Sequence, residues 1–225
     1  LLEVDYDDPY ILEMCSNNKI EAVKKLDTAV YESNLYYKNI KPFQTQNRDV
    51  ELCLRDYKKY EGFIYQDVSF DKQFNEITSL GYFDKEFKYL TLSKKKQIWM
   101  SITPHEINTM QKSIQECSGN CVVLGLGLGY YPYMISLKDN VKSIVVIEKD
   151  KSIIEIFNKY ILPQFEHKEK IRIVEADGFE YVKNMDCDYC FIDLWHDEID
   201  GLPMYEKFLK LEKENITLSL VSKRD

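Results

Sequence analysis

Three glycines and a set of carboxylates are the residues of this 225-residue sequence whose types and spacing favour chemistry. Gly125, Gly127 and Gly129 stand at alternate positions directly after the apolar run Val122 to Leu124. Glycine allows positive φ and lets a ligand come close, because it carries no Cβ. A turn of this kind presents backbone N–H groups at a helix N-terminus, where the helix dipole favours a negatively charged group. The turn therefore predicts a ligand-binding site.

Glu148 follows the next β-branched run, Ser143 to Ile147, nineteen residues past the last glycine. A carboxylate at the end of such a strand is placed to accept hydrogen bonds from ribose hydroxyls, as in dinucleotide-binding strand–helix–strand units. Together, the glycine turn and this acid predict binding of an adenosine-containing cofactor.

The glycine spacing separates two cofactor classes. The dinucleotide fingerprint G-x-G-x-x-G requires a glycine where Tyr130 or Pro132 stands, so a nicotinamide-dependent oxidoreductase is disfavoured. The observed G-x-G-x-G, with its acid after the second strand, resembles the class I (Rossmann-like) S-adenosylmethionine-dependent methyltransferases. The resemblance covers residues 102 to 201. It implies an α/β fold with a doubly wound, mostly parallel sheet, and S-adenosylmethionine bound by the three glycines and Glu148.

A third segment follows in the order that this family requires. Ile171 to Val174 is predicted to be a strand, and Asp177, Gly178 and Phe179 come after it. The resemblance implies that Asp177 accepts a hydrogen bond from the adenine amine and that Phe179 packs on the ring. The alternative role for Asp177 is to cap the helix that begins at Gly178.

A fourth apolar run, Asp188 to Leu194, carries Asp193 near its carboxyl end, followed by His196 and Asp197. Ligands of open α/β sheets bind beyond the carboxyl ends of the strands. We therefore expect Asp193 to share one sheet edge with the other candidates. Asp193, His196 and Asp197 are the candidates for removing a proton from a methyl acceptor, and Asp193 is also a candidate cofactor ligand.

The segment after the fourth strand does not identify the acceptor. Many amino-methylating members of the family carry an acid or Asn followed by Pro-Pro and an aromatic residue, and Asp193-Leu194-Trp195 departs from that pattern. The segment Asp177 to Tyr181 is similar to the matching segment of spermidine synthases. An aminopropyltransferase is thus one alternative to a methyltransferase, and a non-catalytic S-adenosylmethionine-binding protein is another.

Residues 1–101 are predicted to form a smaller α+β region that caps the substrate, and residues 102–225 the cofactor domain. Apolar spacing predicts a helix from Lys19 to Tyr37. The segment from Arg48 to Gln73 is ambiguous, and one interpretation is a helix to Tyr60, a break at Gly62 and then a strand. Phe87 to Leu92 and Gln97 to Ile102 are typical of a β-hairpin.

In the second region, Thr103 and Glu106 are expected to form a capping box at the start of a helix. Further helices are predicted for Tyr130 to Leu137 and Lys151 to Leu162, and a fifth strand for Ile216 to Val221. The family sheet normally adds two more strands, so the given chain is expected to lack them or to complete its sheet with another element. A bare sheet edge invites pairing with a second copy, which leaves a homodimer as an open alternative.

The composition of the chain indicates which classes of binding partner are disfavoured. The net charge of −8 argues against broad, non-specific nucleic-acid binding. No apolar run approaches the ~20 residues that span a bilayer, so we expect a soluble cytoplasmic protein without a membrane partner. Six cysteines include Cys187-x-x-Cys190. A four-thiolate metal site with Cys117 and Cys121 is one interpretation, but cysteines in apolar strands more often serve as small hydrophobic residues, and no metal is expected.

Overall fold

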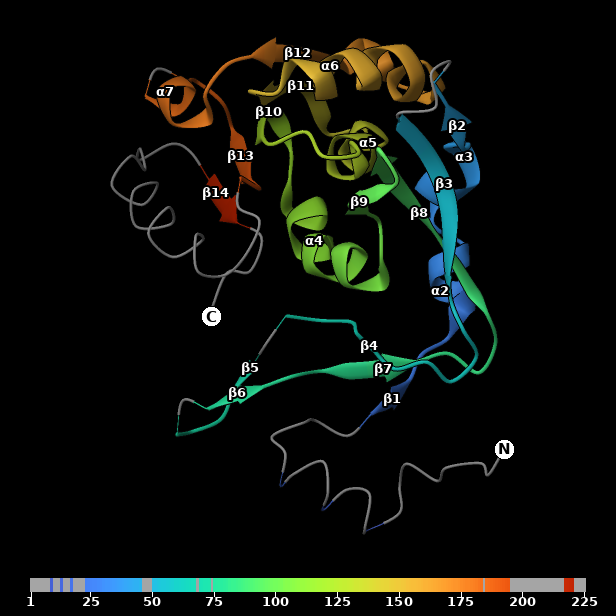
Figure 1. The fold of residues 1–225 in the computed structure, drawn as a ribbon. Coiled ribbons are helices and arrows are strands. Elements are labelled where there is room, and N and C mark those ends of the chain that lie inside the picture. The colour runs from blue at the N-terminus through green and yellow to red at the C-terminus, as the bar shows by residue number, and fades with distance from the viewer. Residues whose placement is uncertain are drawn as a thin grey trace. The chain divides into compact units, whose positions relative to one another are not determined.

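The computed structural model describes residues 23–45, 50–67, 69–73, 75–183, 185–194 and 217–220, together with the isolated positions Pro9, Glu13 and Asn17. The chain divides into two compact units (Figure 1). The first unit comprises Leu1–Lys38 and Pro42–Thr109, and the second comprises Asn39–Lys41 and Met110–Asp225. In the part of the chain that the structure describes, no helix has the length and apolar character needed to cross a lipid bilayer.

A four-stranded antiparallel sheet in the order β2-β3-β8-β9 lies in the first unit. Its strands are β2 (Phe43–Gln44), β3 (Val50–Tyr57), β8 (Phe87–Lys94) and β9 (Gln97–Ser101). The pairing of β8 with β9 confirms the predicted hairpin, whose two turn residues both have positive φ.

The prediction of a helix from Arg48 to Tyr60 is wrong. Residues 50–57 form β3, in which Val50 and Leu52 are buried while the alternate residues Glu51 and Cys53 are half-buried. Side chains of a strand alternate between its two faces, and pairing with β8 along the whole strand decides the outcome over local helix propensity. The predicted strand after Gly62 is present as β4 (Phe63–Ile64).

The long helix predicted from Lys19 to Tyr37 is also wrong within the described residues. The chain instead forms β1 (Lys24–Lys25), α2 (Thr28–Glu32) and α3 (Leu35–Asn39). The Asp27 side chain caps α2 by accepting a hydrogen bond from the Ala29 N–H at 2.9 Å, so a helix begins inside the predicted one. The buried side chains are Leu26, Tyr31 and Tyr36, whereas Val30 of the predicted apolar stripe is 60% exposed.

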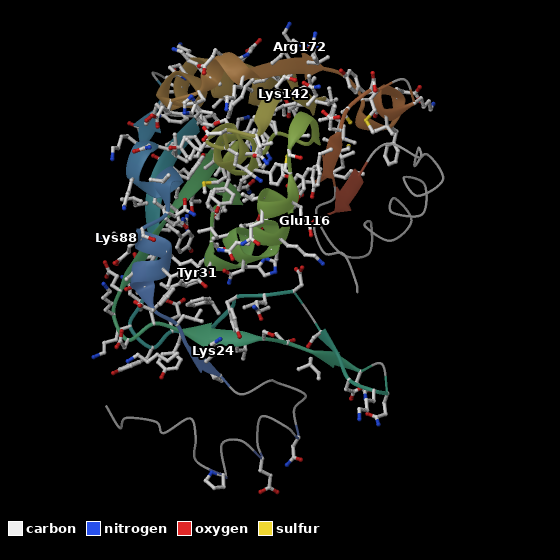
Figure 2. All side chains as sticks on the ribbon, turned by 180° about the vertical axis from the view of Figure 1, so that it is seen from behind. Lys24, Tyr31, Lys88, Glu116, Lys142 and Arg172 are labelled. Atoms are coloured by element: carbon white, nitrogen blue, oxygen red, sulfur yellow. The ribbon has the colours of Figure 1, made fainter. Side chains whose placement is uncertain are left out.

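Short strands complete the first unit. The strand β7 (Leu80–Tyr82) pairs with β1 and β4, and β5 (Ser69–Phe70) pairs with β6 (Glu76–Ile77). Phe83 and Phe87 are fully buried with their ring centroids 4.8 Å apart, and Tyr31 meets both rings edge-on (Figure 2). These three rings form part of the buried core of the first unit.

The second unit holds a five-stranded parallel sheet in the order β12-β11-β10-β13-β14. Its strands are β10 (Gly119–Leu124), β11 (Val141–Glu148), β12 (Ile171–Glu175), β13 (Tyr189–Ile192) and β14 (Thr217–Leu220). In chain order this is 3-2-1-4-5, the order of Rossmann-like sheets. The predicted α/β class and parallel sheet are thereby confirmed.

Helices contact both faces of the central strands. Tyr131 of α5 (Tyr130–Ser136) stacks on Phe191 of β13 with a centroid distance of 3.6 Å. Val182 of α7 (Gly178–Val182) instead packs in a cluster with Cys190 and Ile192, which point the other way because side chains alternate along a strand. The complete doubly wound arrangement stays a prediction, because the segment 195–216 between β13 and β14 lies outside the described residues.

The helix predicted from Lys151 to Leu162 is divided into three parts. An α-helical part, α6 (Lys151–Ile156), continues as a π-helical turn, η1 (Phe157–Ile161), and a 3₁₀ turn, η2 (Leu162–Gln164). The apolar stripe gave the right start and end, but no sequence pattern marks a π-helical turn, which is rare and often lies near functional sites.

At the edge of this sheet, β12 carries exposed charges. Arg172 on β12 and Lys142 on its neighbour β11 are both exposed (Figure 2). Charged side chains on an edge strand discourage pairing with another sheet. A homodimer formed through this edge is therefore disfavoured, and the predicted dimer remains untested.

Candidate functional site

The glycine turn follows β10 and has the backbone that the sequence predicts. Gly125, Gly127 and Gly129 have φ values of +95°, +51° and +75°. A Cβ on Gly125 would overlap the carbonyl oxygen of Asp193, and one on Gly129 would overlap the Phe157 ring. Any larger residue at either position would collide with these neighbours as well as strain the backbone. The turn leads directly into α5, with Gly129 at its N-cap.

Glu148 braces this turn. Its Oε2 accepts a hydrogen bond from the Leu126 N–H at 3.1 Å, and its Oε1 accepts one from the Asp150 N–H at 2.8 Å. Each carboxylate oxygen has two acceptor positions, so both oxygens keep one for a further donor. The residue thus combines a structural role with capacity to bind a ligand hydroxyl.

Asp177 caps α7, as its alternative role anticipated. Its Oδ1 accepts hydrogen bonds from the backbone N–H groups of Phe179 at 2.9 Å and Glu180 at 3.2 Å. Both bonds use the same oxygen, and the residue is exposed. Oδ2 therefore remains available to accept from a ligand amine while the cap is intact.

Asp193 stands directly beside the start of the glycine turn. Its backbone N–H donates to the Leu124 carbonyl at 2.8 Å, while the Gly125 N–H donates to the Ile147 carbonyl at 2.9 Å. Leu194, the next residue, fills the space in front of Gly178, where a Cβ would lie 2.9 Å from its Cδ1. These contacts join the ends of β10, β11 and β13 to the first residue of α7.

The structure brings the three predicted carboxylates to one sheet edge. Leu124 is in register with Ile147 and Ile192, and Glu148 is in register with Glu175, so the strands end together. Glu148, Asp177 and Asp193 therefore lie at the carboxyl ends of three strands, next to the glycine turn. Their ligand-binding roles stay predictions, as does the general-base role of Asp193. His196 and Asp197 lie outside the described residues.

Phe179 contributes to the hydrophobic packing beside α7, so only part of its ring is exposed. It is half-buried and packs, with Ala176 and Leu194, against the cluster that contains Ile192 and Val182. Stacking on a ligand ring remains a prediction for its exposed portion.

Two residues near the turn were missed by sequence reasoning. Asp150 caps α6 by accepting from the Ser152 N–H at 2.8 Å, and an acid directly before a predicted helix is a recognisable cap signal. Phe157 is fully buried and occupies the space that the missing Cβ of Gly129 leaves. Its position depends on the π-helical turn, for which the sequence gives no signal.

The four-thiolate site is wrong for a geometric reason. Cys121 is in register with Tyr189, and Val122 with Cys190, so Cys121 and Cys190 point to opposite faces of the sheet. Cys190 and Cys187 belong to the apolar cluster beneath α7. Among the described residues, no group of three or more His, Cys, Asp or Glu side chains is arranged to hold a metal ion.

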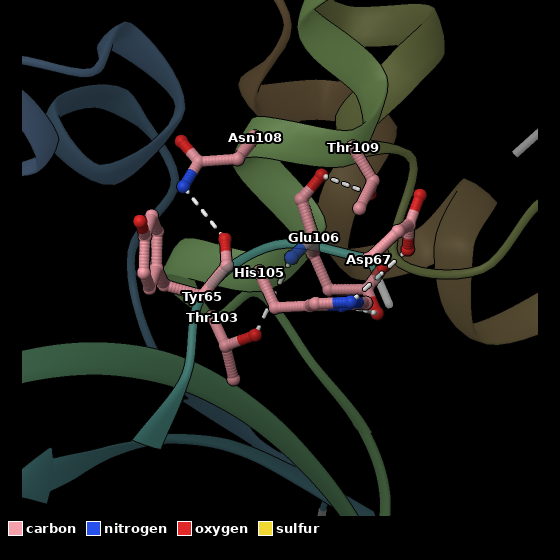
Figure 3. A network of polar contacts seen from close by, with 7 residues as sticks. All are labelled: Tyr65, Asp67, Thr103, His105, Glu106, Asn108 and Thr109. Atoms are coloured by element: carbon pink, nitrogen blue, oxygen red, sulfur yellow. Dashed lines mark hydrogen bonds and ion pairs between the residues drawn. The ribbon is translucent and has the colours of Figure 1, made fainter. Parts of the chain in front are cut away.

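A separate polar network lies in the first unit at the start of α4 (Pro104–Glu116) (Figure 3). His105 Nε2 lies 3.2 Å from Asp67 Oδ1, and its Nδ1 lies 3.9 Å from Glu106 Oε1. The hydrogen bonds to Asp67 and Glu106 raise the pKa of His105 to about 9. The Thr103 hydroxyl accepts from the Glu106 N–H at 3.4 Å, which confirms the predicted Thr103 cap.

Comparison with known proteins gives structural neighbours only. No protein-family model matches the sequence, and no curated protein matches it. The spermidine synthase of Thermotoga maritima is similar over 80% of this chain and 56% of its own, at 15% identity and a TM-score of 0.44. A spermidine synthase in complex with the transition-state analogue AdoDATO is similar over 80% and 57%, at 14% identity and a TM-score of 0.45. The chain thus spans a little over half the length of both proteins.

Proposed function

We propose that this protein binds an adenosyl sulfonium at the carboxyl edge of its parallel sheet and transfers an alkyl group from the sulfur to a nucleophile. The observation that carries the proposal is the glycine turn, held open by three positive φ values and braced by Glu148, with Asp177 and Asp193 at the same edge. Methyl transfer from S-adenosylmethionine is the first form of the proposal.

The charges of this edge support a positively charged ligand. Glu148, Asp150, Asp177 and Asp193 all stand there, and only Lys149 and Lys151 offset them among residues 148–151. Carboxylates attract a cation such as a sulfonium more strongly than the neutral thioether that remains after transfer. The site would therefore favour the reactive form of the cofactor over its product.

Different residues of the site would bind different parts of the cofactor. Glu148 would accept from ribose hydroxyls at its remaining acceptor positions, and Asp177 Oδ2 from the adenine amine. The sulfonium supplies an activated carbon when bound, so the protein chiefly holds the acceptor in line with it. Asp193, beside the glycine turn, would act as the general base that removes a proton from the nucleophile.

Aminopropyl transfer from decarboxylated S-adenosylmethionine is the second form of the proposal. The segment Asp177 to Tyr181 favours it, because it is similar to the matching segment of spermidine synthases and here forms the capped start of α7. The acidic edge also suits an amine acceptor, which is a cation before it loses its proton.

Titration calorimetry tests the shared part of the proposal. The protein should bind S-adenosylhomocysteine, the product of methyl transfer, or 5′-methylthioadenosine, the product of aminopropyl transfer, and should not bind NAD. Binding of neither adenosyl compound would remove the basis of the proposal, and binding of NAD alone would favour an oxidoreductase.

Measuring which group is transferred distinguishes methyl transfer from aminopropyl transfer. Label from methyl-labelled S-adenosylmethionine should enter a component of a cell extract if the protein transfers methyl groups. Label from the aminopropyl group of decarboxylated S-adenosylmethionine should instead enter a diamine. Binding without either transfer would identify a non-catalytic binding protein.

A further inference from the structure

Two cysteines face each other beneath the turn that joins α4 to β10. The Sγ atoms of Cys117 and Cys121 are 2.9 Å apart, and both residues are buried. A disulfide bond measures about 2.0 Å, so the two sulfurs need to approach by only about 1 Å to bond. We propose that Cys117 and Cys121 form a reversible oxidation site that closes to an intrachain disulfide by exchange with a small disulfide such as glutathione disulfide. This inference does not depend on the proposed cofactor.

The surroundings of the pair favour a thiolate on Cys117. The pKa of the Cys117 thiol is lowered by a hydrogen bond from Cys121, against the opposing effect of burial, and Tyr131 and Lys138 lower it further. Lys138 is held close because its Nζ donates to the Cys117 carbonyl at 2.6 Å and to the Gln115 carbonyl at 2.7 Å. The thiolate is the form that attacks a disulfide.

The covering of the pair is thin. Ser118, which lies between α4 and β10, and Asn120, the second residue of β10, are exposed, and Gly119 between them has a φ of +74°. The Cys121 Sγ lies 3.5 Å from the Ser118 carbonyl oxygen, so the backbone of Ser118 contacts the sulfur. Local opening where α4 passes into the first residues of β10 costs less than global unfolding and admits a small oxidant.

The exchange balances in two steps. The Cys117 thiolate attacks one sulfur of glutathione disulfide, forms a mixed disulfide and releases one glutathione thiolate. Cys121 then loses its proton and attacks the Cys117 sulfur, which closes the Cys117–Cys121 bond and releases the second glutathione. The two protein thiols are oxidised by two electrons, and the glutathione disulfide is reduced to two thiols.

The other adjacent pair of cysteines provides an internal control. Cys187 and Cys190 share a C-x-x-C spacing, but both belong to the apolar cluster that contains Val182, and Cys190 points to the sheet face opposite Cys121. Burial raises the pKa of Cys187 to about 11 and that of Cys190 well above its usual value. Neither thiol of this pair has the lowered pKa that Cys117 has, so neither supplies the thiolate that exchange requires.

Peptide mapping distinguishes the two pairs. The intact protein is equilibrated in glutathione buffers of increasing oxidised fraction, quenched by alkylation of free thiols, and digested with trypsin. Residues 113–138 hold Cys117 and Cys121 in one tryptic peptide, and residues 184–207 hold Cys187 and Cys190 in another. We expect only the 113–138 peptide to escape alkylation and lose about 2 Da. A loss confined to the 184–207 peptide, or no loss in fully oxidised buffer, would overturn the proposal.

Cysteine variants and the melting temperature of the oxidised protein provide a second test of the proposal. C121S should abolish the loss of about 2 Da, whereas C190A should leave it unchanged. The oxidised protein should melt about 4–8 °C above the reduced protein, because the bond closes a short loop in the unfolded chain. An equal melting shift in C121S would contradict the assignment.

Discussion

The Leu126 N–H donates to the Glu148 carboxylate at 3.1 Å, so the acid at the end of the second parallel strand holds the middle of the glycine turn. The same carboxylate accepts from the Asp150 N–H. One side chain thereby fixes the backbone on both sides of the predicted ribose position. Glu148 and the glycine turn, predicted as separate ligands, are thus joined by a hydrogen bond within the protein.

Replacing Glu148 by Gln tests this relationship. The amide keeps one acceptor oxygen but loses the other, so one of the two backbone N–H groups loses its partner. We expect the free energy of unfolding to fall by about 1–2 kcal/mol in urea titrations. E175Q is the matched control, because Glu175 is in register with Glu148 but exposed, and its effect should stay within about 0.5 kcal/mol. Equal losses in both variants would contradict the bracing role.

Replacing Gly129 by Ala tests the fit between the turn and the π-helical segment. The methyl group would overlap the Phe157 ring and would stand on a backbone with a φ of +75°. We expect a loss of about 2–4 kcal/mol in the free energy of unfolding. G62A should be nearly neutral, because nothing lies within 4 Å of its added Cβ. In the G129A background, a smaller side chain at Phe157 should recover part of the lost stability. If the effects of the two substitutions on the free energy of unfolding simply add, the two residues are not in direct contact.

Two substitutions of Asp177 separate its cap from its proposed ligand role. D177A removes the cap and should cost about 1 kcal/mol of stability, whereas D177S keeps a capping oxygen and should cost little. If Oδ2 binds the adenine amine, both variants should weaken S-adenosylhomocysteine binding by about 1–3 kcal/mol in calorimetry. Unchanged affinity in D177S would leave Asp177 as a cap only.

His105 predicts a pH dependence. Its pKa is raised to about 9 in the folded protein from about 6.5 when unfolded, so the folded state binds the proton more tightly. The stabilisation is complete below about pH 6.5 and is lost as the pH rises through about 9.

The stability difference between wild type and H105Q should shrink between pH 6 and pH 10. The side chains of His105 and Asp67 are 33% and 36% exposed, so screening limits the effect to about 1 kcal/mol. H167Q, which removes a histidine beside Glu169, controls for the loss of a histidine as such. A constant difference across this range would exclude the His105 network as its source.

Sequence patterns predicted the strands and the glycine turn of the parallel sheet, because their signals are local. The strands β10, β11, β12 and β13 contain short apolar runs, and the glycines at 125, 127 and 129 have the positive φ that their turn needs. Parallel strands end at one sheet edge, so four runs were enough to place Glu148, Asp177 and Asp193 together.

The same approach failed where long-range pairing decides the structure. The residues from Val50 to Tyr57 form a strand because β8, more than thirty residues away, pairs with all of them. The helix predicted to Tyr37 failed because Asp27 begins a new helix and buries different residues. The contact of Phe157 with Gly129 joins residues twenty-eight positions apart, and sequence periodicity does not reveal such a contact.

The segment Asn39–Lys41 has a consequence for how the protein can be dissected. It precedes most of the first unit in the chain but belongs to the second, where Asn39 Nδ2 donates to the Tyr133 hydroxyl at 2.7 Å and the Lys41 N–H donates to Gln164 Oε1 at 2.8 Å. No single cut yields an intact second unit, because a fragment that begins near residue 110 leaves both partners behind. Expression of the second unit alone therefore requires a grafted peptide or a circularly permuted chain.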